Sequence, residues 1–523
     1  MGTIENLREL LPRKLRSIVA IEDHSVAIDE KRRKAAVSDI EAELERDFTR
    51  LRAPTMLEIQ NVVRGSRHRT TYTQLAGMGL LNRVSWICHL RCTGDYAGTG
   101  SFETLLEQLK TLFVLVSLGR PEYGFSTESL HEDSRSRAVH ERLLSQNMKF
   151  AWVSRQALIA IGDAVDASKE FSNALPGFGR AGLLTAHDAI RAFARHPDPR
   201  PFLPSQGAAR ALHAVSMRPG TPASSRRPSE LLNSTDIWVK PLVQFPDGKL
   251  TVASPLHAVT GLDECILTAI DAMLPSGRGA NSQLSKGELF ERVAQRALER
   301  ALPSDPPVSR PAGVYVSPDD SGDIDVILHN GGSSIIGEAK AKARPQTTNG
   351  AGGAFQDQVT EVYEQLNKRL TAISLGRPVR DAADREIPAS HTYLGIGITF
   401  HSYANTMTRH EAYVELPHTG DTKMVSDLHS WLCIAYAVKD AVELEDYMAF
   451  RHKFLQDASA TEEMDLFTFW LRNKRSPDMN LLKSPLTAVP PQFLETSDAF
   501  RLDLSAEHWR NYLLNASKSI KND

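Results

Sequence analysis

The stretch from Gly322 to Lys342, GDIDVILHNGGSSIIGEAKAK, limits most strongly what this chain can fold into. It contains two short runs rich in isoleucine and valine, which β-strands favour, and the letters NGGS between them predict a tight hairpin turn. Four charged residues stand at alternating positions inside the runs: Asp323, Asp325, Glu338 and Lys340. Because side chains alternate between the two faces of a strand, each charged pair shares one face. The hairpin therefore predicts that carboxylates and a lysine meet at one end of a sheet.

The pattern around this hairpin predicts a mixed α/β core. A helical stripe of apolar residues precedes the hairpin, and a two-residue period replaces the helical one after it. In chain order we expect a helix at 285–302, strands at 313–316, 323–329 and 334–341, a glycine-rich loop, a helix at 355–373 and a strand at 392–400. This order of helix, three strands, helix and strand builds an α/β sandwich.

The residue types in the hairpin suit one kind of chemistry. Hard divalent ions such as Mg²⁺ bind a few carboxylate oxygens and keep several waters, which leaves room for phosphate oxygens. In phosphodiester hydrolysis the ion stabilises charge on the phosphate and lowers the pKa of a bound water, and a lysine can orient that water. Asp, Glu and Lys are therefore the residue types that this reaction needs.

At these residues the sequence resembles the PD-(D/E)xK nuclease superfamily, whose members share a restriction-endonuclease-like fold. The usual pattern is an Asp at one strand and Glu-x-Lys on the next; here DIDVI supplies Asp325, and GEAK supplies Glu338 and Lys340. GELFE on the preceding helix supplies Glu291, which matches the helix glutamate of many members. The resemblance covers residues 284–403 and departs from the pattern in that no proline precedes Asp325.

The resemblance implies a role for each of these residues. Asp325, Glu338 and Glu291 would bind Mg²⁺ or Mn²⁺, and the Ala339 carbonyl would add a ligand. Lys340 would act on the attacking water. The implied fold is a mixed-sheet core of the αβββαβ type, flanked by mainly helical N- and C-terminal domains.

The resemblance also implies a glutamine, sometimes followed by a tyrosine, on the helix after the lysine. Gln358 with Tyr363 fills that place, or else Gln365 does. Both choices stay open, because the two glutamines stand on the same predicted helix. The expected catalytic set is Asp325, Glu338, Lys340, Glu291 and Gln358.

A simpler interpretation is that the charged residues of the hairpin form the solvated face of an edge strand pair. Acid-x-Lys triplets are common, and PDGK at 246–249 spells the family name more literally than GEAK does. Asp247 and Gly248 instead favour a hairpin turn between two β-prone runs. The context of GEAK favours the nuclease interpretation: an upstream strand Asp, a Phe-Glu helix before it and a Gln-bearing helix after it.

The length of 523 residues exceeds one ordinary core, so we expect several structural units. The expected division follows changes of pattern and one stretch rich in Pro, Gly and Ser. It comprises a mainly helical N-terminal domain at 1–195, a linker at 196–230, a hairpin and connecting helix at 231–283, the nuclease core at 284–403 and a helical extension at 404–523.

Composition limits the class of protein. There are 61 Lys and Arg against 64 Asp and Glu, a formal net charge of -3, which argues against a surface coated in positive charge for indiscriminate nucleic-acid binding. No apolar run approaches the roughly 18 to 20 residues that cross a bilayer. Cysteine occurs only 4 times and at scattered positions, which fits a reducing compartment. We expect a cytoplasmic protein with no membrane partner.

Two other motifs are weaker. CHLRC, from Cys88 to Cys92, lacks the second ligand pair of a zinc finger, so core packing is the favoured interpretation. RGSRHRTTY, from Arg64 to Tyr72, is a basic run that could contact phosphates, although a solvated loop is favoured.

The expected function is a metal-dependent endonuclease with Mg²⁺ or Mn²⁺ as cofactor and DNA, rather than RNA, as partner. Architecture of this kind suggests a prokaryotic antiviral defence or restriction role by analogy. A homodimer or another homo-oligomer would allow a double-strand cut. Two alternatives stay open: a catalytically silent nuclease-fold binding or scaffold protein, and an RNase or ligand-activated effector nuclease.

Overall fold

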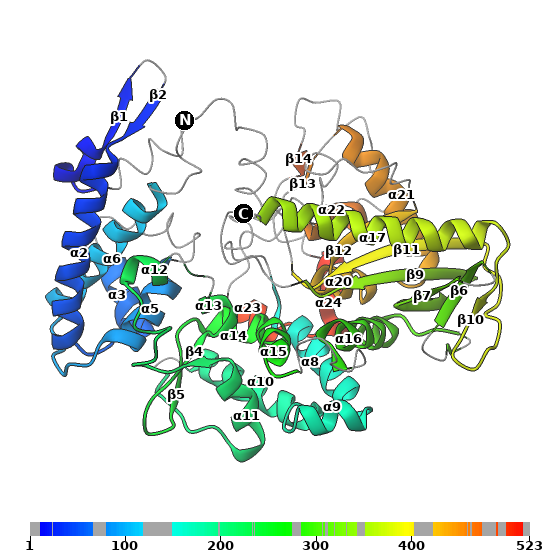
Figure 1. The fold of residues 1–523 in the computed structure, drawn as a ribbon, viewed down its shortest axis with the longest axis horizontal. Helices are drawn as coiled ribbons and strands as arrows, with labels where there is room; N and C mark the ends of the chain where they lie inside the picture. The colour runs from blue at the N-terminus through cyan, green and yellow to red at the C-terminus, as the bar shows by residue number, and fades with distance from the viewer. Residues whose placement is uncertain are drawn as a thin grey trace.

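In the computed structural model the chain is a mixed α/β protein in which helices surround small sheets (Figure 1). The residues that the structure describes are 11–22, 25–65, 80–118, 149–196, 199–232, 234, 236–274, 284–305, 307–308, 312–317, 320–330, 332–342, 351–401, 422–457, 459–460, 463–472, 488–489 and 498–515. Within these residues, no helix combines the length and the apolar character that crossing a bilayer requires.

The elements before residue 119 are mostly helical, as the periodicity predicts. They are η1 (Arg13–Ile18), β1 (Val19–Glu22), β2 (Ser25–Ile28), α2 (Glu30–Arg50), α3 (Met56–Gly65), α5 (Leu80–Arg91) and α6 (Thr99–Leu118). Their buried apolar side chains form one cluster, which also contains Trp238 and Val243 from much later in the chain. The indole Nε1 of Trp86 donates to the carbonyl of Lys240 at 3.1 Å and so fastens α5 to that later segment.

The segment from 199 to 274 contains more regular structure than its composition predicts. Its elements are α11 (Gln206–Ala214), β3 (Ser216–Met217), α12 (Pro228–Leu232), α13 (Asp236–Val239), β4 (Leu242–Gln244), β5 (Leu250–Val252), α14 (Pro255–Thr260) and α15 (Leu262–Asp271). The expected linker at 196–230 therefore includes a packed helix, α11, because Ala208, Ala211 and Leu212 form an apolar stripe that is buried. The hairpin prediction is confirmed: β4 and β5 pair antiparallel, and Gly248 has φ 82° in the turn.

The predicted α/β core is present in the expected order, with one predicted strand broken in two and with two additional strands, β10 and β12. Its elements are α16 (Lys286–Ala301), β6 (Ala312–Ser317), β7 (Asp320–Ile324), β8 (Val326–Asn330), β9 (Ser333–Lys340), α17 (Ala351–Ser374), β10 (Val379–Arg380), β11 (Thr392–Thr399) and β12 (Lys423–Asp427). The break falls at Asp325, because β7 pairs with β6 in one sheet while β8 pairs with β9 in another. The second sheet has the order β12-β11-β9-β8, and β9, β11 and β12 run parallel.

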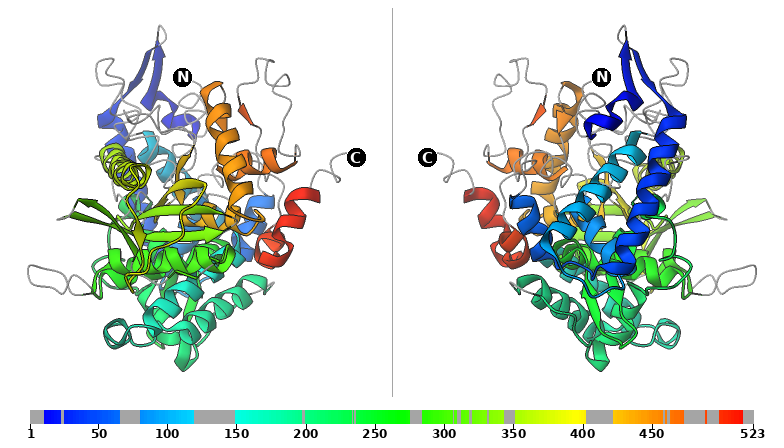
Figure 2. Two further views of the ribbon diagram at one scale, coloured as in Figure 1. Left: turned by 90° about the vertical axis from the view of Figure 1, so that its right-hand side faces the viewer. Right: turned by 90° about the vertical axis from the view of Figure 1, so that its left-hand side faces the viewer.

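The sheet of β9 is covered on both faces, by α16 on one side and α17 on the other (Figures 1 and 2). Ile335 of β9 belongs to the cluster that contains the apolar stripe of α16. Ile336, the next residue, belongs to the cluster with Ala372 and Ile373 of α17. The alternation predicted from the sequence is therefore confirmed, but neither face is solvated.

The free side of β8 is occupied by side chains and backbone from α16 and the residues after it. Gln295 accepts from the Ile327 backbone N at 2.8 Å and donates to the Ile327 carbonyl at 3.0 Å. Two residues further along β8, the backbone N of His329 donates to Ser304 Oγ at 3.2 Å. The carbonyl of His329 accepts from the backbone N of Asp305 at 2.7 Å. The polar groups at this edge of the sheet therefore have partners within the same chain.

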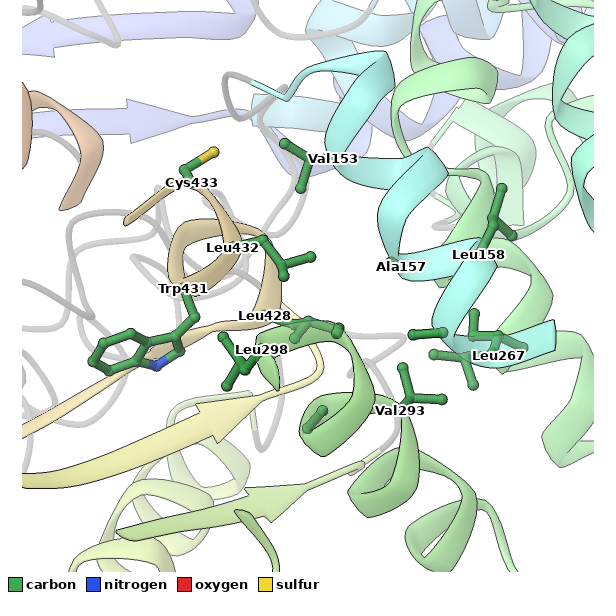
Figure 3. Close-up of a cluster of buried hydrophobic side chains, with 14 of the residues drawn as sticks. Val153, Ala157, Leu158, Leu267, Val293, Leu298, Leu428, Trp431, Leu432 and Cys433 are labelled. Carbon is green, nitrogen blue, oxygen red and sulfur yellow. The ribbon is translucent and has the colours of Figure 1, made fainter. Parts of the chain in front are cut away.

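The remaining helices share one core with α16 and the sheet. They are α8 (Ala151–Asp166), α9 (Lys169–Ala174), α10 (Arg180–Arg195), α20 (Leu428–Ala435), α21 (Ala441–Asp457), α22 (Glu463–Arg472), α23 (Asp498–Asp503) and α24 (Ala506–Asn515), with the short strands β13 (Ser459–Ala460) and β14 (Ala488–Val489). Figure 3 shows Val153 and Ala157 of α8, Val293 of α16 and Leu428 of α20 within this core.

The grouping of the buried residues differs from the expected domain division. A unit at 1–195 was expected, yet α8 and α10 belong to the cluster of the sheet, whereas residues 11–118 form a separate cluster. The physical reason is that α8 buries 12 of its 16 residues, so it requires neighbours on nearly every side. Periodicity identifies such a helix but does not identify which elements cover it.

Candidate active site

Asp325 lies at the break between β7 and β8 and is tied to the next strand. One carboxylate oxygen, Oδ2, accepts a hydrogen bond from the backbone N of Ala339 at 2.8 Å. Ala339 stands between Glu338 and Lys340 on β9, so this contact holds the Asp325 carboxylate beside both. The structure therefore brings together three residues that the sequence predicts to meet, although Asp325 sits outside a regular strand.

Glu338 is the most perturbed of these residues. It is 2% exposed, on a strand that lies between β8 and β11, which excludes the interpretation of a solvated edge hairpin. Burial, followed by the charge of Asp325, raises the pKa of Glu338 to about 8, although Arg369 and Lys340 act in the opposite direction. A hydrogen bond with Asp325 also favours its protonated form. The two carboxyl groups therefore share a proton at neutral pH unless a cation takes its place.

One oxygen of Glu338 remains without a hydrogen bond. Its Oε1 has no hydrogen-bond partner among the described residues, and the nearest cation is Arg369, with Nε at 3.4 Å. A buried carboxylate oxygen without a hydrogen bond is costly, and the charge of Arg369 offsets only part of that cost. Divalent cations of the Mg²⁺ kind bind such oxygens. The donor set of Asp325 and Glu338 therefore fits a cation.

Lys340 ends β9 at the border between the buried sheet and solvent. Its side chain is 21% exposed, and its Nζ lies 3.6 Å from Glu361 on α17. Lys342, two residues further, lies 3.0 Å from the same carboxylate but is 40% exposed. Lys340 is therefore partly exposed and its charge still acts on Glu338, whereas Lys342 is more exposed.

Gln358 is the glutamine that contacts the motif. It is buried, and its Nε2 donates to the carbonyl of Lys340 at 3.1 Å. Gln365, two turns further along α17, also points inward, and its Oε1 has no hydrogen-bond partner in the described part of the chain. Tyr363 is buried in another direction, near Arg451 of α21. The structure thus places Gln358 at the strand end, without Tyr363 beside it.

Arg369 is a site residue that the sequence analysis missed. It stands on the same face of α17 as Gln358 and Gln365, because these positions are spaced by seven and four residues. Its guanidinium ion-pairs with Glu338, and its Nε also donates to the carbonyl of Asp323 at 2.7 Å. The spacing along α17 was the available signal, but an arginine on an amphipathic helix is more often a surface residue.

The position of Arg369 depends on Gly322, and this dependence yields a prediction. A Cβ atom at Gly322 would lie 2.6 Å from Nη1 and 2.8 Å from Cζ of Arg369. Gly322→Ala is therefore expected to displace the guanidinium and to lower the free energy of unfolding by about 1–3 kcal/mol in urea denaturation. Gly313→Ala is the control, because its Cβ would meet only the Gly322 carbonyl at 3.4 Å. An equal loss in both variants would contradict the role of Arg369.

Glu291 lies on α16 near the same end of the sheet. The ring of Phe290, its neighbour in sequence, packs against Phe400 with centroids 5.5 Å apart, and the Phe400 N donates to the Lys340 carbonyl at 3.2 Å. No group of three or more His, Cys, Asp or Glu able to hold a metal occurs among the described residues. Glu291 therefore does not complete a three-carboxylate set with Asp325 and Glu338.

A buried polar cluster at the same edge of the sheet was also missed. His401 follows β11, and His429 lies in α20 just after β12, so the parallel strands bring both to one edge. His429 Nε2 lies 2.7 Å from Asp263 Oδ2 of α15. Burial lowers the pKa of His429, but the charge of Asp263, its hydrogen bond and the charge of Glu264 together outweigh burial, so the pKa is raised above its usual value. Beside this pair, Lys149 forms a buried ion pair with Glu264.

The weaker motifs have ordinary surroundings where they are described. Lys249 of PDGK pairs with Asp247 at 2.7 Å on the surface, as a turn residue would. Cys88 is buried, and a hydrogen bond with Cys92 together with burial raises the pKa of its thiol. The backbone of Arg64 and Gly65 ends α3, and the rest of the basic run, 66–72, lies outside the described residues.

Comparisons with protein-family models, with curated proteins and with solved structures found no match to this chain.

Proposed function

We propose that this protein is a metal-dependent nuclease that hydrolyses phosphodiester bonds, with DNA as its substrate. The observation that carries the proposal is the contact between half-buried Asp325 and buried Glu338, with Lys340 at the same strand end. Two carboxyl groups in contact inside a protein repel one another when ionised, so they favour either a proton or a divalent cation between them. A lysine at the border of such a pair is suited to phosphate and water.

Asp325 and Glu338 would hold Mg²⁺ or Mn²⁺, which when bound supplies charge stabilisation at the phosphate and acidifies a coordinated water. Residues of the chain itself would position the carboxylate, the strand end and the attacking water. The Ala339 amide fixes the Asp325 carboxylate, and Gln358 fixes the strand end through the Lys340 carbonyl. Lys340 would orient the attacking water and offset the negative charge that develops on the phosphate.

The test is cleavage of supercoiled plasmid, single-stranded DNA and RNA with Mg²⁺, with Mn²⁺ and with a chelator. We expect cleavage of DNA that requires the cation and that falls at least about 100-fold in Asp325→Asn. Asp323→Asn is the matched control, because Asp323 is exposed and offers Arg369 its backbone carbonyl rather than its side chain. Equal activity in wild type and both variants would reject this site, and cleavage of RNA alone would reject DNA as the substrate.

A second candidate function is a nuclease-like fold that binds nucleic acid without cutting it. The observation that favours it is Arg369, whose guanidinium lies 3.4 Å from Glu338 and partly neutralises it without any metal. In that case binding to DNA would be independent of divalent ions, and no cleavage would occur under any of the conditions above. A gel-shift assay in the presence of chelator distinguishes the two functions.

A further inference from the structure

A polar cavity of about 230 Å³ lies between α8, α10 and the segment that joins α23 to α24. It shares no lining residue with the candidate active site. At roughly 30 Å³ for each water in the liquid, its volume corresponds to about seven or eight waters. This is below the range of drug-sized pockets and suits a small molecule.

Buried polar groups without partners surround this cavity. His187 is 0% exposed; its Nδ1 lies 3.7 Å from Oδ1 of Asp188, a long contact that lowers the pKa of Asp188, and its Nε2 makes no hydrogen bond to any described residue. Trp152 Nε1, Gln156 Oε1 and Arg191 Nε also have no hydrogen-bond partner within the described residues. Each such group is costly in the interior if it stays unpaired. The four side chains therefore indicate an occupant that carries both donors and acceptors.

The charges around the cavity are balanced. Two lining residues are cationic, Arg155 and Arg191, and two are anionic, Asp503 and Glu507. Arg191 lies 3.5 Å from Asp503. A simple anion or a simple cation would meet a repelling charge in such a site, and an apolar molecule would leave the buried polar groups unpaired. A small molecule that carries both charges avoids all three of these problems.

We propose that this cavity binds a small zwitterion of the α-amino-acid type. Its carboxylate faces the N–H groups of Trp152 and Arg191, and its ammonium faces the Gln156 carbonyl oxygen and the carboxylates of the C-terminal segment. His187 supplies a further donor or acceptor, according to its tautomer. This site is independent of the proposed nuclease function.

The occupant would join two parts of the chain that are far apart in sequence. Arg195 and Arg191 of α10 already pair with Asp503 at the end of α23, and the Arg501 Nε donates to the carbonyl of Lys149 at 3.1 Å. Binding adds contacts between this C-terminal segment and α8. Since α8 packs against α16 and α20 (Figure 3), the ligand stabilises the side of the core that supports the sheet.

The test uses the full chain and measures thermal unfolding and tryptophan fluorescence with each of the common α-amino acids. Acetate, methylamine, inorganic phosphate and nucleosides serve as partial or unrelated probes. We expect at least one amino acid to raise Tm by about 2 °C or more at saturation and to slow amide hydrogen exchange in residues 498–515. Acetate or methylamine alone should not do so.

Two variants connect the effect to the cavity. Gln156→Leu and Arg191→Met should each remove the ligand-dependent shift. Arg195→Met is the matched control, because Arg195 also pairs with Asp503 but does not line the cavity, so this variant should keep the shift.

Three outcomes would overturn the proposal. The first is no shift with any amino acid together with a higher Tm for ligand-free His187→Phe, which would mark a cavity that holds only water. The second is an equal shift with acetate or phosphate, which would mark an anion site. The third is a shift with nucleosides alone, which would assign the cavity to another class of ligand.

Discussion

Lys340→Ala is expected to lower metal-dependent cleavage by about 10²- to 10⁴-fold and to leave the fold intact. Lys340 is partly exposed at the end of β9, so its loss opens no cavity in the core, whereas its charge acts on the buried Glu338. The measurement is the single-turnover rate on DNA at saturating Mg²⁺, with circular dichroism as the check on folding.

Lys342→Ala is the matched control for this experiment. Lys342 lies two residues further along the chain and pairs with the same Glu361, but it is more exposed and has no described effect on Glu338. It should retain most of the activity. If both variants lose activity equally, the effect belongs to a basic strand end that binds phosphate, and the specific role of Lys340 is wrong.

Glu338→Gln is expected to make the metal-free protein more stable at alkaline pH while it abolishes the response to Mg²⁺. The folded-state pKa of Glu338 is about 8, far above its ordinary value of 4.5. Between these two values the folded protein binds one more proton than the unfolded chain, so the free energy of unfolding of wild type falls as pH rises. The slope for this one group is about 1.4 kcal/mol per pH unit, which amounts to several kcal/mol across the window.

The experiment is urea denaturation of both proteins at several pH values from about 5 to 9 in chelator. The difference in stability, variant minus wild type, should grow with pH and stop growing above about pH 8, because the glutamine carries no titratable proton. Saturating Mg²⁺ should then stabilise wild type by about 3 kcal/mol at 100 times its dissociation constant, and should not stabilise the variant.

Glu361→Gln is expected to change the free energy of unfolding in the opposite direction from Glu338→Gln. Partial burial raises the pKa of Glu361, but its contacts with Lys342 and Lys340 outweigh burial, so the pKa is lowered. Its stabilisation is present above the unfolded pKa, and this variant should therefore be slightly less stable than wild type at pH 8. A variant of Glu338 that behaved in the same way would contradict a buried Glu338 whose pKa is raised beside Asp325.

Local pattern accounts for the parts of the site that lie on neighbouring elements. The turn NGGS and the two-residue period of β8 and β9 fix an antiparallel pair, and the register of this pair brings Asp325 close to Glu338. The same pattern did not predict the break at Asp325, because the break arises where β7 turns away to pair with β6. That pairing depends on tertiary contacts, and the alternation of residues within a single run does not predict it.

Contacts between distant segments of the chain could not be predicted from local sequence patterns. His429 and Asp263 are separated by 166 residues, and neither stands in a motif. Arg369 reaches Glu338 only because Gly322 leaves room for its side chain, a steric condition set by the fold. The sharing of one core by α8 and α16 likewise depends on which apolar surfaces meet, and many helices of this composition would offer similar surfaces.

The occupied edge of β8 restricts how copies of this protein can associate. A strand with free N–H and C=O groups is a template on which another chain can add a strand. Here Gln295 holds both backbone groups of Ile327, and the residues after α16 hold those of His329. A second copy therefore cannot extend the sheet through this edge without displacing its own chain. Any homodimer that cuts both strands of a duplex must be built from helices or from another surface.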